Sequence, residues 1–202
     1  MNNVNEILIA GFGGQGILFA GKLLAYFGLL GGKEVSWLPS YGPAMRGGTC
    51  NCSVCVSDEP IGSPLVTQPN LLLVMNTPSY NKFIGMVKPG GKVFLDSTLV
   101  DSVQEPKVFA PCGGMTFVDS NTSDSGANAV ENIERFDIPA TKLALDNELK
   151  GMANIIMLGK LLKETKIASV ETAREAMEKV VSKGKEHLFE LNMKALNLGI
   201  NY

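Results

Sequence analysis

The chain has 202 residues, of which 45% are hydrophobic and 19% charged, values that suit one folded domain and argue against a disordered chain. Eighteen Lys and Arg against twenty Asp and Glu give a formal net charge of −2. The strongly basic surface of a protein that binds nucleic acid or anionic membranes is therefore not expected. A single histidine, His187, excludes metal sites that need two or more imidazole ligands, and we expect it to be a half-buried packing residue.

Neither a secretion signal nor a membrane span is expected. The N-terminus lacks a basic segment followed by an apolar stretch and a cleavage site. The most apolar long window, residues 17–30, contains Gly21 and Lys22 and is shorter than a helix that crosses a bilayer. Because no secretion signal precedes the four cysteines, we expect a cytoplasmic protein with reduced thiols.

The first elements along the chain are predicted to form a βαβ unit. An apolar run at residues 6–10 predicts a buried strand that leads into a cluster of glycines, residues 17–30 predict a helix, and residues 33–38 predict a second strand. Such a unit requires a parallel sheet. Further strands are predicted at 49–56, 70–75, 92–95, 108–110, 115–118 and 136–138, and further helices at 79–87 and 127–133.

The remainder of the chain, from Thr141 onward, is predicted to be mainly helical. Residues 152–162 are apolar with a helical period, and residues 169–198 place apolar side chains three and four positions apart, in one stripe. Gly199 follows where a helix C-cap is expected. The sequence thus predicts one α/β domain over residues 1–202, with a Rossmann-like, doubly wound, mostly parallel sheet, helices on both faces and a long C-terminal amphipathic helix.

A glycine motif, G-x-G-x-x-G, lies between the first predicted strand and helix. Glycines allow positive φ and a close approach of phosphate to the backbone, and the start of a helix carries a positive partial charge. The amide of Gln15 could donate to a phosphate oxygen. The alternative is a turn that only lets the helix pack closely on the sheet. The candidate residues are Gly11, Gly13, Gly14, Gln15 and Gly16.

Ordinary nicotinamide binding is disfavoured by the second predicted strand. Dinucleotide-binding folds carry Asp or Glu at the end of that strand, where it binds the ribose. Here the strand ends in Leu38, Pro39 and Ser40, and Glu34 lies at its other end. An independent dinucleotide-binding dehydrogenase or reductase therefore stays an alternative, whereas binding of an anion remains compatible with the motif.

A second loop, rich in Gly and Pro, follows the second predicted strand. In open α/β sheets the loops after the carboxyl ends of strands line the binding crevice. Pro43 restrains the residue before it, and Arg46 offers a planar fork suited to phosphate or carboxylate. The alternative is a surface turn with a solvated Arg. The candidate residues are Tyr41, Gly42, Pro43, Met45, Arg46, Gly47 and Gly48.

Three cysteines lie on the strand predicted at residues 49–56. Side chains alternate along a strand, so Cys50 and Cys52 should face one way and Cys55 the other. We therefore expect small buried residues and no metal site, with a redox or metal protein as the alternative. Cys112 is predicted to be a loop thiol of unassigned reactivity.

Three stretches together carry a family resemblance. They read Gly11-Phe-Gly-Gly-Gln-Gly-Ile17, Trp37-Leu-Pro-Ser-Tyr-Gly-Pro-Ala-Met-Arg-Gly-Gly-Thr49 and Ser57-Asp-Glu-Pro-Ile-Gly-Ser-Pro64. Over nearly its whole length the chain resembles the gamma subunit of 2-oxoacid:ferredoxin oxidoreductases. Residues 154–159 are also similar to the family's helical Asn-x-x-x-Leu-Gly segment.

Two positions depart from that family's pattern. The chain has Ala44 where the family commonly has an acidic residue, and Cys50 where it usually has Ala. A role of that acid in assembly is therefore not carried over to this chain.

The resemblance implies a non-catalytic gamma subunit that binds no cofactor of its own. Its partners would be thiamine-binding alpha and beta subunits and a separate ferredoxin-like delta subunit. Such a complex uses thiamine diphosphate, Mg and iron–sulfur clusters to decarboxylate a 2-oxoacid, reduce ferredoxin and form an acyl-CoA. The two loops would then lie at the shared interface, with the phosphates of CoA as the anion nearby.

The resemblance favours 2-oxoglutarate over pyruvate and ketoisovalerate as substrate. A homodimer of the isolated chain is expected if an apolar surface that normally contacts a partner is left uncovered.

Overall fold

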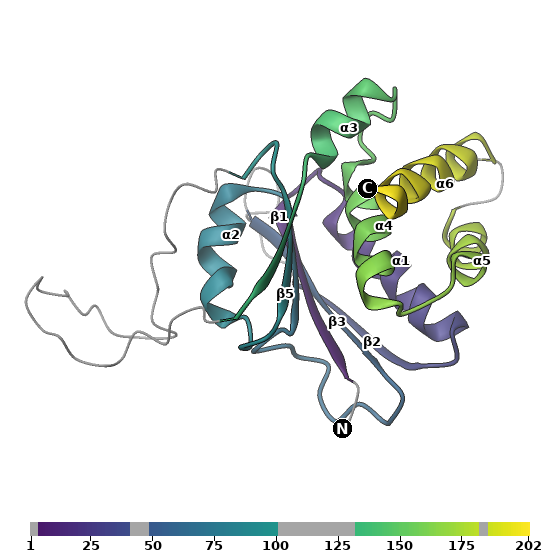
Figure 1. Ribbon diagram of the computed structural model, residues 1–202. Coiled ribbons are helices and arrows are strands. Elements are labelled where there is room, and N and C mark those ends of the chain that lie inside the picture. The colour runs from purple at the N-terminus through teal and green to yellow at the C-terminus, as the bar shows by residue number, and fades with distance from the viewer. Residues whose placement is uncertain (1–3, 41–48, 101–131, 182–185) are drawn as a thin grey trace, which may run out of the picture.

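The computed structural model describes residues 4–40, 49–100, 132–181 and 186–202 (Figure 1). Six strands form one sheet in the order β2-β3-β1-β4-β5-β6. The strands are β1 (Asn5–Phe12), β2 (Glu34–Ser40), β3 (Thr49–Ser57), β4 (Leu71–Val74), β5 (Lys92–Asp96) and β6 (Glu134–Ile138). The helices are α1 (Ile17–Leu30), α2 (Thr77–Phe83), the 3₁₀ turn η1 (Ile84–Met86), α3 (Ala140–Asp146), α4 (Ala153–Thr165), α5 (Val170–Val180) and α6 (Glu186–Asn201).

The sheet is mostly parallel, as predicted. Strands β1, β4, β5 and β6 pair in parallel, while β3 is antiparallel to both of its neighbours, β1 and β2. The predicted βαβ unit is present, because β1 and β2 run in the same direction, but β3 is inserted between them. This order leaves β2 at the edge of the sheet, where Pro39, which has no N–H to donate, is tolerated.

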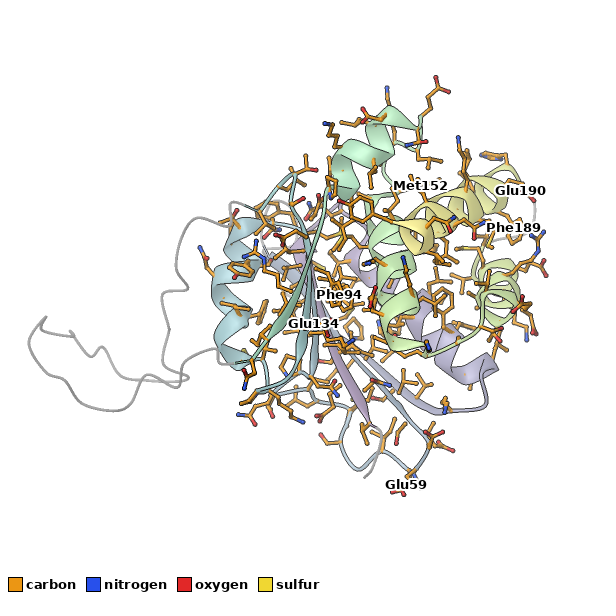
Figure 2. The ribbon with its side chains drawn as sticks, in the orientation of Figure 1. Glu59, Phe94, Glu134, Met152, Phe189 and Glu190 are labelled. Atoms are coloured by element: carbon orange, nitrogen blue, oxygen red, sulfur yellow. The ribbon has the colours of Figure 1, made fainter. Side chains whose placement is uncertain are left out.

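Helices cover both faces of the sheet, which confirms the predicted layering. Helices α1, α4, α5 and α6 pack on one face, and α2 with η1 packs on the other (Figure 1). Alternation along β1 divides the core between the faces: Ile7 and Ile9 face the larger helical layer, and Leu8 and Ala10 face the smaller one. Phe94 of β5 lies in the interior on the larger side (Figure 2).

The predicted apolar stripe at residues 169–198 is helical but belongs to two helices. Helix α5 begins after Ser169, whose hydroxyl accepts from the N–H of Thr172 at 3.1 Å, and ends where Val181 adopts extended dihedral angles. Helix α6 then packs against α4 and ends beside the core (Figure 1). Both helices bury their apolar sides in the same core, so the periodicity continues although the helix does not.

Gly199 lies inside α6 and is not the predicted helix cap. A Cβ on Gly199 would be 1.9 Å from the carbonyl oxygen of Ile156 in α4, and one on Gly159 would be 2.1 Å from the carbonyl oxygen of Leu196 in α6. The two glycines therefore allow the backbones of α4 and α6 to approach closely.

Some predicted elements lie outside the described residues. These are the strands at 108–110 and 115–118, the loop from Tyr41 to Gly48, and all but the end of the helix at 127–133. The last two residues of that range, Asn132 and Ile133, precede β6 and are not helical. Within the ranges that the structure covers, no helix has the length and apolar character needed to cross a bilayer.

Candidate functional site

The glycine loop connects the carboxyl end of β1 to the start of α1. The N–H of Gln15 donates to the carbonyl oxygen of Phe12 at 3.1 Å, which closes the turn. Gly14 has φ 103° and Gly16 has φ 73°, backbone angles that residues other than glycine rarely adopt. The first turn of α1 receives no hydrogen bond from a capping side chain. The backbone of this turn therefore requires glycine at positions 14 and 16.

Gln15 ties the loop to the neighbouring strand. Its Oε1 accepts from the N–H of Phe12 at 2.6 Å and from Nδ2 of Asn76 at 3.2 Å, and its Nε2 donates to the carbonyl oxygen of Met75 at 2.9 Å. Both ends of the amide thus bind residues of this chain. Donation from Gln15 to a phosphate stays a prediction, and it would use the remaining N–H of Nε2.

Two glycines of the motif also make room for neighbouring side chains. A Cβ on Gly11 would be 2.6 Å from Cδ1 of Ile17, and one on Gly16 would be 2.5 Å from Nδ2 of Asn154. Gly14 differs, because it is exposed and a Cβ there would have no neighbour within 4 Å. Close packing accounts for Gly11 and Gly16, whereas the environment of Gly14 is open to an approaching group.

Asn154, in the first turn of α4, connects that helix to the loop. Its Nδ2 donates to the carbonyl oxygen of Gly16 at 3.0 Å, an oxygen that also accepts from the N–H of Ala20. The side chain is buried, and its Oδ1 has no hydrogen-bond partner among the described residues. Sequence reasoning gave Asn154 no contact, although an amide in an otherwise apolar helix start was a signal for one.

A pocket of about 410 Å³ opens beside the loop, at the edge of the sheet where β1 and β4 end. Most of its lining is apolar and comes from α3, the start of α4 and the turn after β5. Sequence reasoning missed this pocket because its walls come from distant parts of the chain. The lining residues are Gly14, Gln15, Met75, Leu99, Thr141, Ala144, Leu145, Lys150, Gly151 and Ala153.

Asp96 fixes one wall of this pocket. The carboxylate is fully buried and accepts from the N–H of Thr98 at 3.1 Å, from the N–H of Thr141 at 3.2 and 3.3 Å, and from the hydroxyl of Thr141 at 2.5 Å. These bonds join the turn after β5 to the start of α3. They also replace the water that a buried carboxylate loses.

The second predicted loop is attached to the same edge of the sheet. Its residues, Tyr41 to Gly48, lie outside the described ones, but β2 ends at Ser40 and β3 begins at Thr49. Thr49 is paired with Phe12, the last residue of β1. The two ends of the second loop are therefore on the side where the glycine loop begins.

Residues 6–202 match the family described as "Pyruvate ferredoxin/flavodoxin oxidoreductase". The chain belongs to this family. The resemblance inferred from the motifs is thereby confirmed, and the similar proteins agree with a gamma subunit of the 2-oxoacid:ferredoxin oxidoreductase family.

Individual oxidoreductase subunits match over almost the entire chain. The 2-oxoglutarate synthase subunit KorC of Methanocaldococcus jannaschii is 35% identical over 196 residues, which cover 96% of this chain and 91% of KorC. The ketoisovalerate oxidoreductase subunit VorA of Methanothermobacter marburgensis is 33% identical over 199 residues. That match covers 98% of this chain but 36% of VorA, so the chain spans about a third of that relative's length.

A solved structure shows the same fold. It is the gamma subunit of a keto/oxoacid ferredoxin oxidoreductase from Geobacter sulfurreducens PCA, with a TM-score of 0.72 and 27% sequence identity over 97% of this chain and 96% of that one.

The cysteine strand of this oxidoreductase family member is structural. Cys50 and Cys52 face the core under α1 while Cys55 faces the other side, which confirms the predicted alternation. Burial raises the pKa of Cys52 to about 12, although a hydrogen bond from Trp37 opposes this rise. Burial raises the pKa of Cys50 and Cys55 as well. In the described parts of the chain no group of three or more His, Cys, Asp or Glu side chains could hold a metal ion.

The only histidine of this oxidoreductase family member is exposed on α6, so the expectation of a half-buried His187 was wrong. Residues that follow it in α6, among them Phe189, Met193 and Leu196, supply the packing against the core.

The sheet order adds an argument against an independent dehydrogenase. In a dinucleotide-binding fold the ribose carboxylate comes from a strand beside β1. Here β3 separates β2 from β1, and Glu34 is paired with Ser57 at the end of β2 away from the glycine loop. The other neighbour, β4, is followed by Met75 and Asn76, which carry no charge.

Proposed function

We propose that this chain is a non-catalytic gamma subunit of a 2-oxoacid:ferredoxin oxidoreductase, which docks on the thiamine-binding subunits through the edge that carries the two loops. The observation that carries the proposal is the family match over residues 6–202. The chemistry of this edge supports it, since the amide of Gln15 and the carboxylate of Asp96 already bind residues of the chain itself. Both groups therefore help to hold the fold together, which supports a non-catalytic role.

The partners follow from the family. We propose thiamine-binding alpha and beta subunits and a ferredoxin-like delta subunit, with ferredoxin as the electron acceptor of the assembled complex. Thiamine diphosphate, Mg and iron–sulfur clusters would be bound by those chains and not by this one.

We further propose that the two loops contribute to CoA binding. Gly14 leaves the backbone open, and the first turn of α1 has no capping side chain to compete for an anion. Arg46, in the second loop, would supply a planar fork to a phosphate. The candidate substrate is 2-oxoglutarate, supported by the similarity to a 2-oxoglutarate synthase subunit along 91% of that subunit's length.

A reconstituted complex tests the subunit role. The chain is co-expressed with its alpha, beta and delta partners under anaerobic conditions, and 2-oxoacid-dependent reduction of viologen is measured with 2-oxoglutarate, pyruvate and ketoisovalerate. We expect activity only from the complex that contains this chain, and highest with 2-oxoglutarate. A fully active complex without the chain would contradict the proposal, and a preference for another 2-oxoacid would contradict the substrate alone.

The CoA role has a separate test. Arg46→Ala should raise the KM for CoA or weaken assembly, whereas Lys179→Ala, on the surface of α5, should do neither. An intact complex with an unchanged KM for CoA in the Arg46 variant would exclude the role proposed for that side chain.

Calorimetry with NAD(H) and NADP(H) tests the alternative function. Micromolar binding of either nucleotide to the isolated chain would favour an independent dehydrogenase.

A further inference from the structure

The pocket beside the glycine loop has an apolar rim that faces outward. Leu145 of α3 is 58% exposed and Leu99, in the turn after β5, is 42% exposed, and both line the pocket. A small ligand inside the pocket would leave the outer sides of these leucines in water. A protein surface laid over the rim would cover them, and exposed apolar patches of this kind mark such contacts.

The polar groups of the pocket wall have little left to offer a polar ligand. The Gln15 amide is bound to the ends of β1 and β4, and the Thr141 hydroxyl donates to Asp96. Lys150 is the charged side chain in the lining, and it has no ion-pair or hydrogen-bond partner within the described ranges. The pocket therefore offers an apolar surface with one available positive charge.

We propose that this pocket receives a large apolar side chain of a thiamine-binding subunit, and that an Asp or Glu beside that side chain pairs with Lys150. The inference rests on the proposed function and specifies the contact that it requires. The pocket is walled by Gly14 and Gln15 of the glycine loop, so the contact is continuous with the proposed interface. An apolar anchor in a pocket flanked by a charged pair is a common centre of binding energy at interfaces.

Single substitutions at the rim test this contact. We measure the Kd between the purified chain and the assembled thiamine-binding subunits for Leu145→Asp, Leu99→Asp and Lys150→Glu. The matched control is Leu29→Asp, because Leu29 is 56% exposed near the end of α1. All four sites are exposed, and circular dichroism confirms that each variant is folded.

We expect Leu145→Asp and Leu99→Asp to raise the Kd at least tenfold, and Leu29→Asp to change it less than twofold. Lys150→Glu should raise the Kd several-fold, with a larger effect at low salt because the pair is near solvent. Equal Kd values for the Leu145 and Leu29 variants would overturn the inference and leave the subunit role intact. Failure of the wild-type chain to bind the thiamine-binding subunits would overturn the proposed function as well.

A photo-crosslink identifies what occupies the pocket. The photoreactive amino acid p-benzoylphenylalanine is introduced at position 145 of the chain in the reconstituted complex, and crosslinked peptides are sequenced by mass spectrometry. We expect a peptide of a thiamine-binding subunit with an apolar side chain next to Asp or Glu. A peptide from a second copy of this chain, or from the ferredoxin-like subunit, would overturn the inference.

Discussion

At the residue scale, Gln15 shows how one side chain organises the glycine loop. Its position in the motif was evident from the sequence, but its partners Met75 and Asn76 lie about sixty positions further along the chain. Local spacing cannot reveal such partners, because they meet only when β4 pairs with β1. The sequence therefore identified the loop correctly and left the contacts of its amide open.

Removal of the Gln15 amide should loosen the loop and destabilise the fold. Gln15→Ala loses three hydrogen bonds and leaves the carbonyl oxygen of Met75 without this donor. We expect a loss of about 2 kcal/mol in the free energy of unfolding. Urea denaturation measures it, with Gln68→Ala as control, because Gln68 is exposed. A change below ~0.5 kcal/mol, the usual size for a surface substitution, would show that the amide does not hold the loop.

The buried cysteines make the fold sensitive to alkaline pH. The pKa of Cys52 is raised from 9.0 to about 12 by burial, so the folded chain keeps a proton that the unfolded chain releases above pH 9. The unfolded state then binds fewer protons, and stability falls as pH rises from 9 toward 12.

We expect Cys52 to contribute a slope of up to ~1.4 kcal/mol per pH unit in that range. Urea denaturation of the wild type and of Cys52→Ala at pH 8 and pH 10.5 measures this contribution. Other groups that titrate at alkaline pH are present in both proteins, so their effects cancel when the two pH slopes are subtracted. Iodoacetamide should label Cys50, Cys52 and Cys55 only after unfolding, since all three are buried. Equal pH slopes, together with rapid labelling of any of these three cysteines in the native chain, located by peptide mapping so that Cys112 is counted separately, would contradict both expectations.

At the element scale, predictions succeeded where the sequence signal is local. They failed where the structure depends on which other element of the chain packs alongside. The strand that enters the glycine loop and the helix at 17–30 follow from the apolar pattern and from Gly31. The insertion of β3 between β1 and β2 does not follow from that pattern. The side chains of β1 alternate between the two faces in the same way beside an antiparallel neighbour as beside a parallel one. Likewise, α5 and α6 keep one apolar period across the residues that separate them.

The close contact of α4 and α6 makes Gly199 sensitive to any side chain. Gly199→Ala places a Cβ 1.9 Å from the Ile156 carbonyl oxygen, so the helices must separate. Ala is intrinsically favoured over Gly in a helix by about 1 kcal/mol, yet we expect a net loss of roughly 2–3 kcal/mol from overpacking. Thermal denaturation checks this result against Gly85→Ala, where a Cβ would meet nothing within 4 Å. An unchanged or raised midpoint for the Gly199 variant would mean that the helices adjust at no cost.

At the scale of the whole molecule, the two edges of the sheet differ in character. The carboxyl ends of β1 and β4 carry the glycine loop and the apolar pocket. At the opposite side of the sheet, Glu6 of β1 pairs with Lys88, and Lys33, before β2, pairs with Asp58, after β3. That side has ion pairs and a pocket of about 470 Å³ with a more polar lining, which includes Glu6 and Lys88. The first end presents apolar groups and, among the described residues, a Lys150 without an ion-pair partner. The apolar character of the first end is what we expect of the proposed docking edge.

Docking at that edge should make the stability of the chain depend on its partners. A partner subunit at a free concentration 100 times its Kd stabilises the folded chain by about 2.7 kcal/mol. Each 1 kcal/mol of added stability raises the melting midpoint of a domain of this size by about 2–4 °C. The chain should therefore melt roughly 5–10 °C higher with excess thiamine-binding subunits than alone. Fluorescence of a dye attached to this chain follows its unfolding within the mixture. Leu145→Asp should abolish most of the shift while the isolated variant melts like the wild type, because Leu145 is exposed in the unbound chain. An equal shift for both proteins would place the docking surface elsewhere on the molecule.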